Sequence, residues 1–107
     1  MSEGIGKKTV RDIDVAGKRV LVAGGGDSAV ESAIALADAG ALVTLSYRGR
    51  ELSRPKPENV ARLMHSSVVK RLGTTIREIR PDDVVLARED GGEETIANDV
   101  VFAMIGR

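Results

Sequence analysis

Several residue types are missing or scarce in this 107-residue chain, and each shortage excludes a class of function. There is no cysteine, which excludes disulfides, thiolate metal sites, a redox Cys-x-x-Cys pair and cysteine nucleophiles. One histidine, one tyrosine and one phenylalanine leave little material for a metal cluster or a base-stacking surface. We therefore expect no metal site and no nucleic-acid partner.

An excess of charge and a long apolar run are also missing. Sixteen basic residues balance sixteen acidic ones, so bulk charge attracts neither nucleic acid nor an anionic membrane. No apolar stretch reaches the roughly 18–20 residues that a membrane span needs. The first residues, MSEGIGKKTVRD, lack the apolar core of a secretory signal. We expect no membrane partner and a cytoplasmic location.

The first half of the chain reads as strand, helix and strand. Residues 1–15 are expected to form a flexible lead-in, and residues 16–107 a single domain. The consecutive apolar residues of 18–24 are typical of a strand buried on both faces, as in a parallel sheet. Apolar residues at helical spacing predict a helix over 27–40, capped by its first aspartate or serine. A second branched strand follows at 41–47, which makes the two strands parallel.

The second half adds a helix and mostly short strands. We expect a helix over 58–72, a third strand over 74–79, and a last buried strand over 99–106. A Gly-Gly turn between 83–89 and 94–97 predicts a hairpin. The fold class is therefore α/β: a Rossmann-like three-layer domain whose mostly parallel sheet carries a small antiparallel β-meander, which crosses to the last strand.

Three consecutive glycines join the first strand to the first helix. The run Gly24-Gly25-Gly26-Asp27-Ser28-Ala29 fits the pattern G-x-G-x-x-A. Gly24 allows a tight turn, Gly26 lets a pyrophosphate approach the backbone, and Ala29 lets the helix pack closely on the strand. The helix N-terminus would face the phosphates, and Ser28 adds a hydroxyl donor. The pattern predicts a dinucleotide site, and a turn that serves only packing is the alternative.

The end of the second strand bears on which nicotinamide cofactor binds. An NAD site usually places Asp or Glu there, to bind the ribose 2′-hydroxyl. Here Tyr47 and Arg48 stand at that place, and Arg50 and Arg54 follow closely. Arginine pairs well with phosphate, which favours NADP, and NAD stays as the alternative. We expect Tyr47 or Arg48 to stack on the adenine.

Two further residues are candidates for the nicotinamide end of the site. Glu31 lies on the first turns of the helix, where it could face the nicotinamide or simply be an exposed glutamate. Gly106 ends the last strand at the carboxyl edge, where ligands bind in open α/β sheets. A plain strand end is its alternative. No Ser, Cys or carboxylate arrangement indicates a catalytic pair with His65, so we expect this histidine to be structural or exposed. No residue is assigned a catalytic role.

Two segments carry a family resemblance. AGKRVLVAGGGDSAVESAIALADAGALVTLSYRGREL and the closing DVVFAMIGR resemble the NAD(P)H-binding domain of thioredoxin-reductase-like flavoproteins, in the pyridine nucleotide–disulfide oxidoreductase class. The resemblance covers residues 14–107. It implies pyrophosphate-binding roles at Gly24, Gly26, Asp27, Ser28 and Ala29, and places near the nicotinamide for Glu31, Ile105 and Gly106.

The resemblance also implies a function. In that family the domain is inserted into an FAD-binding domain, so this chain is expected to be an excised piece that binds NAD(P)H and presents it to an FAD held outside the chain. Alone it would catalyse nothing, and its parent could be a homodimer. Family members that reduce disulfides directly from this domain carry a Cys-x-x-Cys pair, which this chain lacks. In this respect the chain resembles the branch of ferredoxin–NADP and bacillithiol-type reductases. The family's His-Arg-Arg element reads Tyr47-Arg48-Gly49, so Arg50 or Arg54 would replace the second arginine.

A function of another class stays open beside this one. A stand-alone regulatory module could sense a dinucleotide without redox catalysis. Such modules typically place an acidic residue at the end of the second strand, and this sequence has none there.

Overall fold

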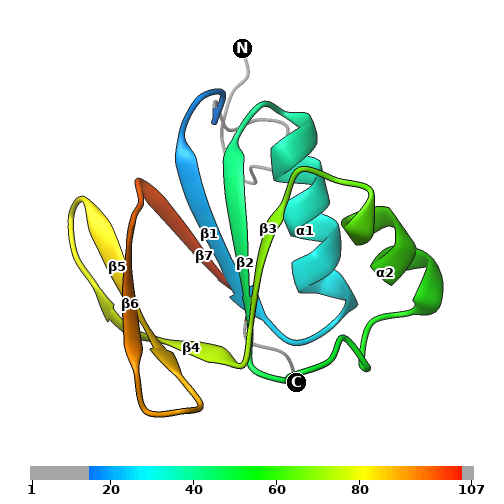
Figure 1. Cartoon of the computed structure of the whole chain (residues 1–107). Coiled ribbons are helices and arrows are strands. Elements are labelled where there is room, and N and C mark those ends of the chain that lie inside the picture. The colour runs from blue at the N-terminus through cyan, green and yellow to red at the C-terminus, as the bar shows by residue number, and fades with distance from the viewer. Residues whose placement is uncertain (1–14, 105–107) are drawn as a thin grey trace.

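The computed structural model describes residues 15–104, which form three layers. A four-stranded parallel sheet lies in the middle, two helices cover one face, and a three-stranded antiparallel sheet lies against the other (Figure 1). This arrangement confirms the predicted α/β class, with a Rossmann-like parallel sheet and a β-meander before the last strand.

The parallel sheet has the order β3-β2-β1-β7. Its strands are β1 (Arg19–Gly24), β2 (Leu42–Tyr47), β3 (Val69–Leu72) and β7 (Val100–Met104). The chain moves outward from β1 through β2 to β3, and then returns to the other side of β1 as β7. The strand order therefore reverses between β1 and β7, which is the place where open α/β sheets bind ligands.

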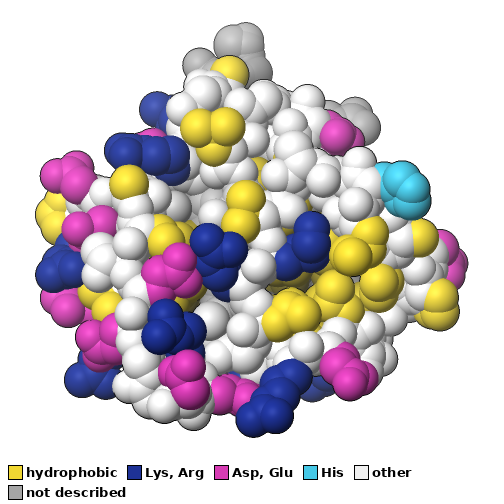
Figure 2. Space-filling model, in the orientation of Figure 1, with side chains coloured by type: hydrophobic (Ala, Val, Ile, Leu, Met, Phe, Trp, Pro, Cys, Tyr) yellow, Lys and Arg dark blue, Asp and Glu magenta, His cyan; other side chains and the backbone are white. Residues whose placement is uncertain are grey.

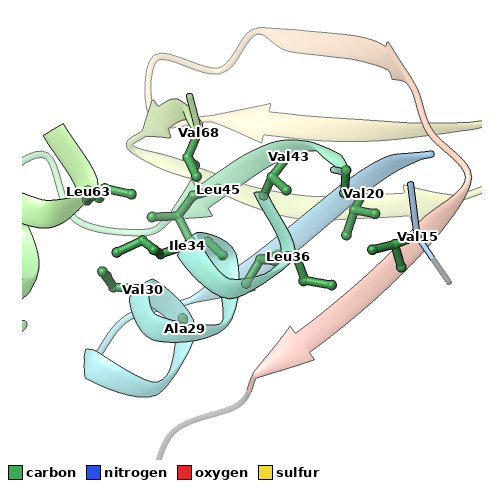
Figure 3. Packing of buried hydrophobic residues seen from close by; sticks show 13 residues of the cluster. Val15, Val20, Ala29, Val30, Ile34, Leu36, Val43, Leu45, Leu63 and Val68 are labelled. Carbon is green, nitrogen blue, oxygen red and sulfur yellow. The ribbon is translucent and has the colours of Figure 1, made fainter. Parts of the chain in front are cut away.

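Two helices cover one face of this sheet. Helix α1 (Asp27–Asp38) connects β1 to β2, and helix α2 (Pro57–Met64) precedes β3. The apolar side of α1 packs on the sheet, with Ile34 next to Leu45 and Leu63 of α2 close by (Figure 3). Leu45 and Leu63 are fully buried, so solvent does not reach the core between the helices and the sheet at these residues.

The antiparallel sheet covers the opposite face. It consists of β4 (Thr74–Ile79), β5 (Asp83–Arg88) and β6 (Glu93–Ala97), in the order β4-β5-β6. Side chains alternate along a strand, so Leu21 of β1 points away from the helices and packs with Val84 and Leu86 of β5. Burial on both faces explains the uninterrupted apolar run of β1.

The predicted helix over 58–72 is wrong in its second half. The helix ends at Met64, and Val69–Leu72 form the edge strand β3 next to β2. Ser66 accounts for the stop: its hydroxyl donates to the carbonyl of Leu63 at 2.6 Å and accepts the backbone N–H of Val68 at 3.2 Å. These local hydrogen bonds compete with helix continuation, and branched valines then favour a strand.

The predicted third strand exists but belongs to the other sheet. Residues 74–79 form β4, which pairs antiparallel with β5. Gly73 has φ of +68°, a conformation that favours glycine, and the chain turns there from one sheet to the next. The buried hydroxyls of Ser46 and Thr74 are 2.7 Å apart and tie the two sheets together at this corner.

The beginning of the described chain differs in one respect from expectation. Val15, which the sequence assigns to the lead-in, is buried in the core beside Val20. A turn follows it directly, with φ of +76° at Gly17. Residues 1–14 lie outside the described part. Between residues 15 and 104, neither helix is long and apolar enough to cross a membrane.

Charged side chains of both signs alternate over the antiparallel sheet. Figure 2 shows them interleaved on the side of β4–β6. Carboxylates of this sheet form three ion pairs: Glu94 with Arg71 of β3, Glu93 with Arg77, and Asp83 with Arg80. The visible face therefore carries no broad area of one charge over this sheet.

Leu21 tests the contact between the two sheets. We expect Leu21→Ala to lower the free energy of unfolding by about 2–5 kcal/mol, because it opens a cavity between the layers. Leu42→Ala is the matched control, since this leucine is 64% exposed on the neighbouring strand, and its effect should stay within about 0.5 kcal/mol. Urea denaturation followed by circular dichroism measures both. Equal losses would contradict the packing described.

Candidate functional site

The glycine loop begins where β1, β7 and the start of α1 meet. A Cβ atom on Gly24 would lie 2.7 Å from both the Ala29 Cβ of α1 and the Met104 carbonyl oxygen of β7. Gly24 and Met104 are also register partners in the sheet. The missing side chain at residue 24 thus lets the start of α1 approach the ends of both β1 and β7.

The next two glycines face open space. Among residues 15–104, Cβ atoms on Gly25 or Gly26 would meet no atom within 4 Å outside their own neighbours. Gly26 is the N-cap of α1 in an extended conformation, with φ −141° and ψ −166°. These glycines are therefore not required for internal packing, and they leave room above the backbone for a ligand.

No side chain of the described residues caps the start of α1. Neither Asp27 nor Ser28 caps it, contrary to expectation, because Asp27 is already the first helical residue. The N–H groups of the first turn are therefore not satisfied by a capping side chain, and they carry the positive end of the helix dipole. Backbone donors beside an open glycine loop suit an anionic group such as a phosphate.

The carboxylates of Asp27 and Glu31 turn toward α2, where they meet a residue that sequence reasoning missed. The Asn59 Nδ2 donates to Asp27 Oδ1 at 2.7 Å and to Glu31 Oε2 at 3.0 Å. Asn59 is only 4% exposed. The backbone N–H of Lys56 donates to the same Asp27 oxygen at 2.8 Å. An asparagine on an amphipathic helix gives no sequence signal for this role.

These hydrogen bonds keep Asp27 charged. The backbone N–H of Lys56 and the amide of Asn59 hold the pKa of the Asp27 carboxyl below its usual value, because both donate to the ionised form. A negative charge thus remains next to the glycine loop, with one oxygen already occupied on the side of α2.

Tyr47 does not fit its expected role. Its side chain is 2% exposed, so the ring offers no free face on which an adenine could stack. A Cβ on Gly49 would lie 2.9 Å from Cε2 of this ring, and the phenolic oxygen accepts the backbone N–H of Arg54 at 3.3 Å. The ring instead supports the loop that leaves β2.

This loop, residues 48–56, is the basic segment. Arg50 in it pairs with Glu89, which raises the pKa of the guanidinium. Arg48 and Arg54 are exposed, and within residues 15–104 their guanidinium groups have no hydrogen-bond or ion-pair partner. Of the three predicted phosphate-binding arginines, two therefore remain unengaged in the described part and one is held by a carboxylate.

The other predictions concern residues that the structure does not describe or does not bring to the loop. Ile105 and Gly106 lie outside the described residues. His65 is exposed at the end of α2, and its Nδ1 lies 2.8 Å from the carbonyl oxygen of Ala61. In the described part of the chain, no group of three or more potential ligand side chains could hold a metal ion.

A cleft of about 180 Å³ lies at the amino ends of the parallel strands, whereas the glycine loop lies at their carboxyl ends. Its lining comes largely from the first residues of β1, β2 and β3, including Arg19, Leu42 and Val69. None of the predicted site residues that the structure describes lines it. We do not assign it to the site, because ligands of open α/β sheets bind at the carboxyl ends of the strands.

The fold and the loop together define a Rossmann-like α/β domain. Residues 3–107 match the family model for pyridine nucleotide-disulphide oxidoreductases. The chain therefore belongs to this family, which confirms the resemblance seen in the sequence.

Individual relatives agree with the family. The chain is 37% identical over 94 residues to bacilliredoxin reductase Bdr of Bacillus subtilis, covering 83% of this chain and 29% of that protein. It is 34% identical over 96 residues to a ferredoxin–NADP reductase of Ignicoccus hospitalis, covering 85% and 31%. The chain thus spans about a third of the length of these relatives.

Solved structures show the same likeness. The thioredoxin reductase of Lactococcus lactis superposes with a TM-score of 0.80 at 28% identity, over 85% of this chain and 32% of that one. The bacillithiol disulfide reductase of Staphylococcus aureus gives 0.79 at 34% identity, over 86% and 30%. These neighbours support the arrangement of layers described above.

Gly24 and Gly25 should differ in how well they tolerate an added methyl group. Gly24→Ala should lower the free energy of unfolding by about 1–3 kcal/mol, because its methyl group would overlap Ala29 and the backbone of Met104. Gly25→Ala is the matched control. It should change stability by less than about 1 kcal/mol, since its methyl group meets open space. Thermal and urea unfolding compare the two, and a stable Gly24→Ala variant would refute the close approach.

Proposed function

We propose that this domain binds NAD(P)H at the glycine loop and presents it for hydride transfer to FAD held by another part of a longer flavoprotein. The observation that carries the proposal is the uncapped start of α1 above the open Gly25 and Gly26, at the place where the strand order reverses. Membership of the oxidoreductase family supports it.

The pyrophosphate is the part of the cofactor that the loop suits best. Gly25 and Gly26 leave the backbone accessible, and the first-turn N–H groups of α1 can donate to phosphate oxygens. Ser28 is exposed in this turn and can add a hydroxyl donor. The Asp27 carboxylate, which would repel a phosphate, has one oxygen bound by Lys56 and Asn59 on the side of α2.

The 2′-phosphate of NADP is the proposed partner of the basic segment. Arg48 directly follows β2, where an NAD-binding domain typically has an acidic residue. Arg54 is exposed nearby in the chain, and both guanidinium groups are unpaired within the described residues. Several relatives are named ferredoxin–NADP reductase, which supports NADP over NAD.

The chain contributes binding and orientation to the proposed reaction. When bound, the nicotinamide ring supplies the hydride. Glu31 stays a prediction for the nicotinamide side, and its carboxylate is held in place by Asn59. No residue of the chain is assigned a covalent or proton-transfer step.

Titration calorimetry with NADPH, NADH and ADP-ribose tests the site. We expect binding with Kd below about 1 mM, and at least a tenfold loss in Gly26→Val, roughly 1.4 kcal/mol. The valine should leave the fold intact, because φ of −141° is extended and its Cβ points into open space. Unfolding curves of the variant serve as the control. No binding by any of the three ligands, or full binding by a folded Gly26→Val, would overturn the proposal.

Cofactor choice has its own test. Arg48→Ala should weaken NADPH about tenfold and leave NADH nearly unchanged, because charge-assisted hydrogen bonds to a phosphate are worth about 1.5–3 kcal/mol. Arg77→Ala is the matched control, since this arginine lies on β4 and pairs with Glu93. It should change neither affinity. Equal weakening of NADPH and NADH by Arg48→Ala would argue for a site that ignores the 2′-phosphate.

A further inference from the structure

The basic segment contacts the rest of the domain through four of its residues, Gly49, Arg50, Arg54 and Lys56. The buried ring of Tyr47 packs against Gly49 near the start of the segment, and its phenolic oxygen accepts the N–H of Arg54 further along. Arg50 pairs with Glu89 of the antiparallel sheet layer. At its end, the N–H of Lys56 donates to Asp27 at the first residue of α1. The last contact is the one that joins the segment to the glycine loop.

Asn59 reinforces this last contact from the core side. Its two donor contacts to Asp27 and Glu31 link α2 to successive turns of α1. Its carbonyl oxygen lies 3.4 Å from Nη1 of Arg62 and accepts from it. Because Asn59 is 4% exposed, its side chain is nearly covered and has no surface to offer a cofactor.

Helix α2 depends on such contacts for its position. It has only eight residues and no side-chain cap at its start, so its intrinsic stability is low. Its buried residues are Asn59 and Leu63, one polar and one apolar anchor. Leu63 holds the helix against the core, whereas Asn59 and Lys56 hold its first turn, and hence the end of the basic segment, against Asp27.

We infer that Asn59 is a positioning residue, which fixes the basic segment relative to the glycine loop and so sets selectivity for the 2′-phosphate without touching the cofactor. The inference rests on the proposed function. Both NADPH and NADH would place the same pyrophosphate on the glycine loop, whereas only NADPH would use the arginines of the basic segment. Losing the link between the two should therefore weaken NADPH more than NADH.

The experiment measures both dissociation constants for the 107-residue chain and its variants. Asn59→Ala should raise the Kd of NADPH about fivefold or more and that of NADH less than about twofold. Asn98→Ala is the matched control: Asn98 is also 4% exposed, and its Nδ2 donates to the carbonyl of Val100 at 2.9 Å, beside the amino end of β7. It should leave the ratio of the two constants unchanged even if it lowers stability.

A second variant keeps the test decisive if Asn59→Ala does not fold. Asp27→Ala breaks the same link from the surface side. It removes a negative charge and can tighten both dinucleotides, but the ratio of NADH to NADPH dissociation constants should still fall. A ratio equal to that of the parent chain, in whichever of the two variants folds, would overturn the inference and leave the proposed function standing. A parent chain that binds neither dinucleotide would overturn the proposed function itself, and the inference with it.

Discussion

The close approach at Gly24 is the constraint on which the rest of the site depends. A single missing Cβ lets Ala29 and the end of β7 come within van der Waals range of β1. Helix α1 therefore starts directly above the carboxyl ends of β1 and β7, where the strand order reverses. The following two glycines can then stay open, because the packing requirement has been met at residue 24. The packing role and the proposed binding role, which were alternatives in the sequence, can therefore belong to different glycines of one loop.

The basic segment shows how a surface loop depends on layers beneath it. Its contacts reach Tyr47 in β2, Asp27 in α1 and Glu89 beyond β5, so all three layers take part. Tyr47 stabilises the segment by burial of its ring, and Arg50 by an exposed ion pair, which is worth little by itself. Arg48 and Arg54 stay exposed on this loop, whose last residue is held at the first residue of α1.

Local patterns in the sequence predicted the β-α-β unit, the glycine loop, the hairpin and the last strand, and the structure contains each of them. The failures share a cause. Residues 69–72 continue an apolar helical pattern, yet they form β3, because the free edge of β2 offers partners for their backbone groups. Tyr47 stands at the place of an adenine contact, yet the fold buries it. No local sequence pattern reveals the contacts of Asn59, because its partners are 28 and 32 residues away in the chain.

The sequence by itself determined which segments could be strands or helices, and where a turn without side chains had to occur. Periodicity and conformational freedom are properties of neighbouring residues, so they can be read in order along the chain. Only the tertiary structure decided which element covers each buried face, which arginine is already paired and which carboxylates an asparagine holds. Those outcomes depend on hydrogen bonds and packing between residues far apart in the chain, whose partners exist only after the layers have come together.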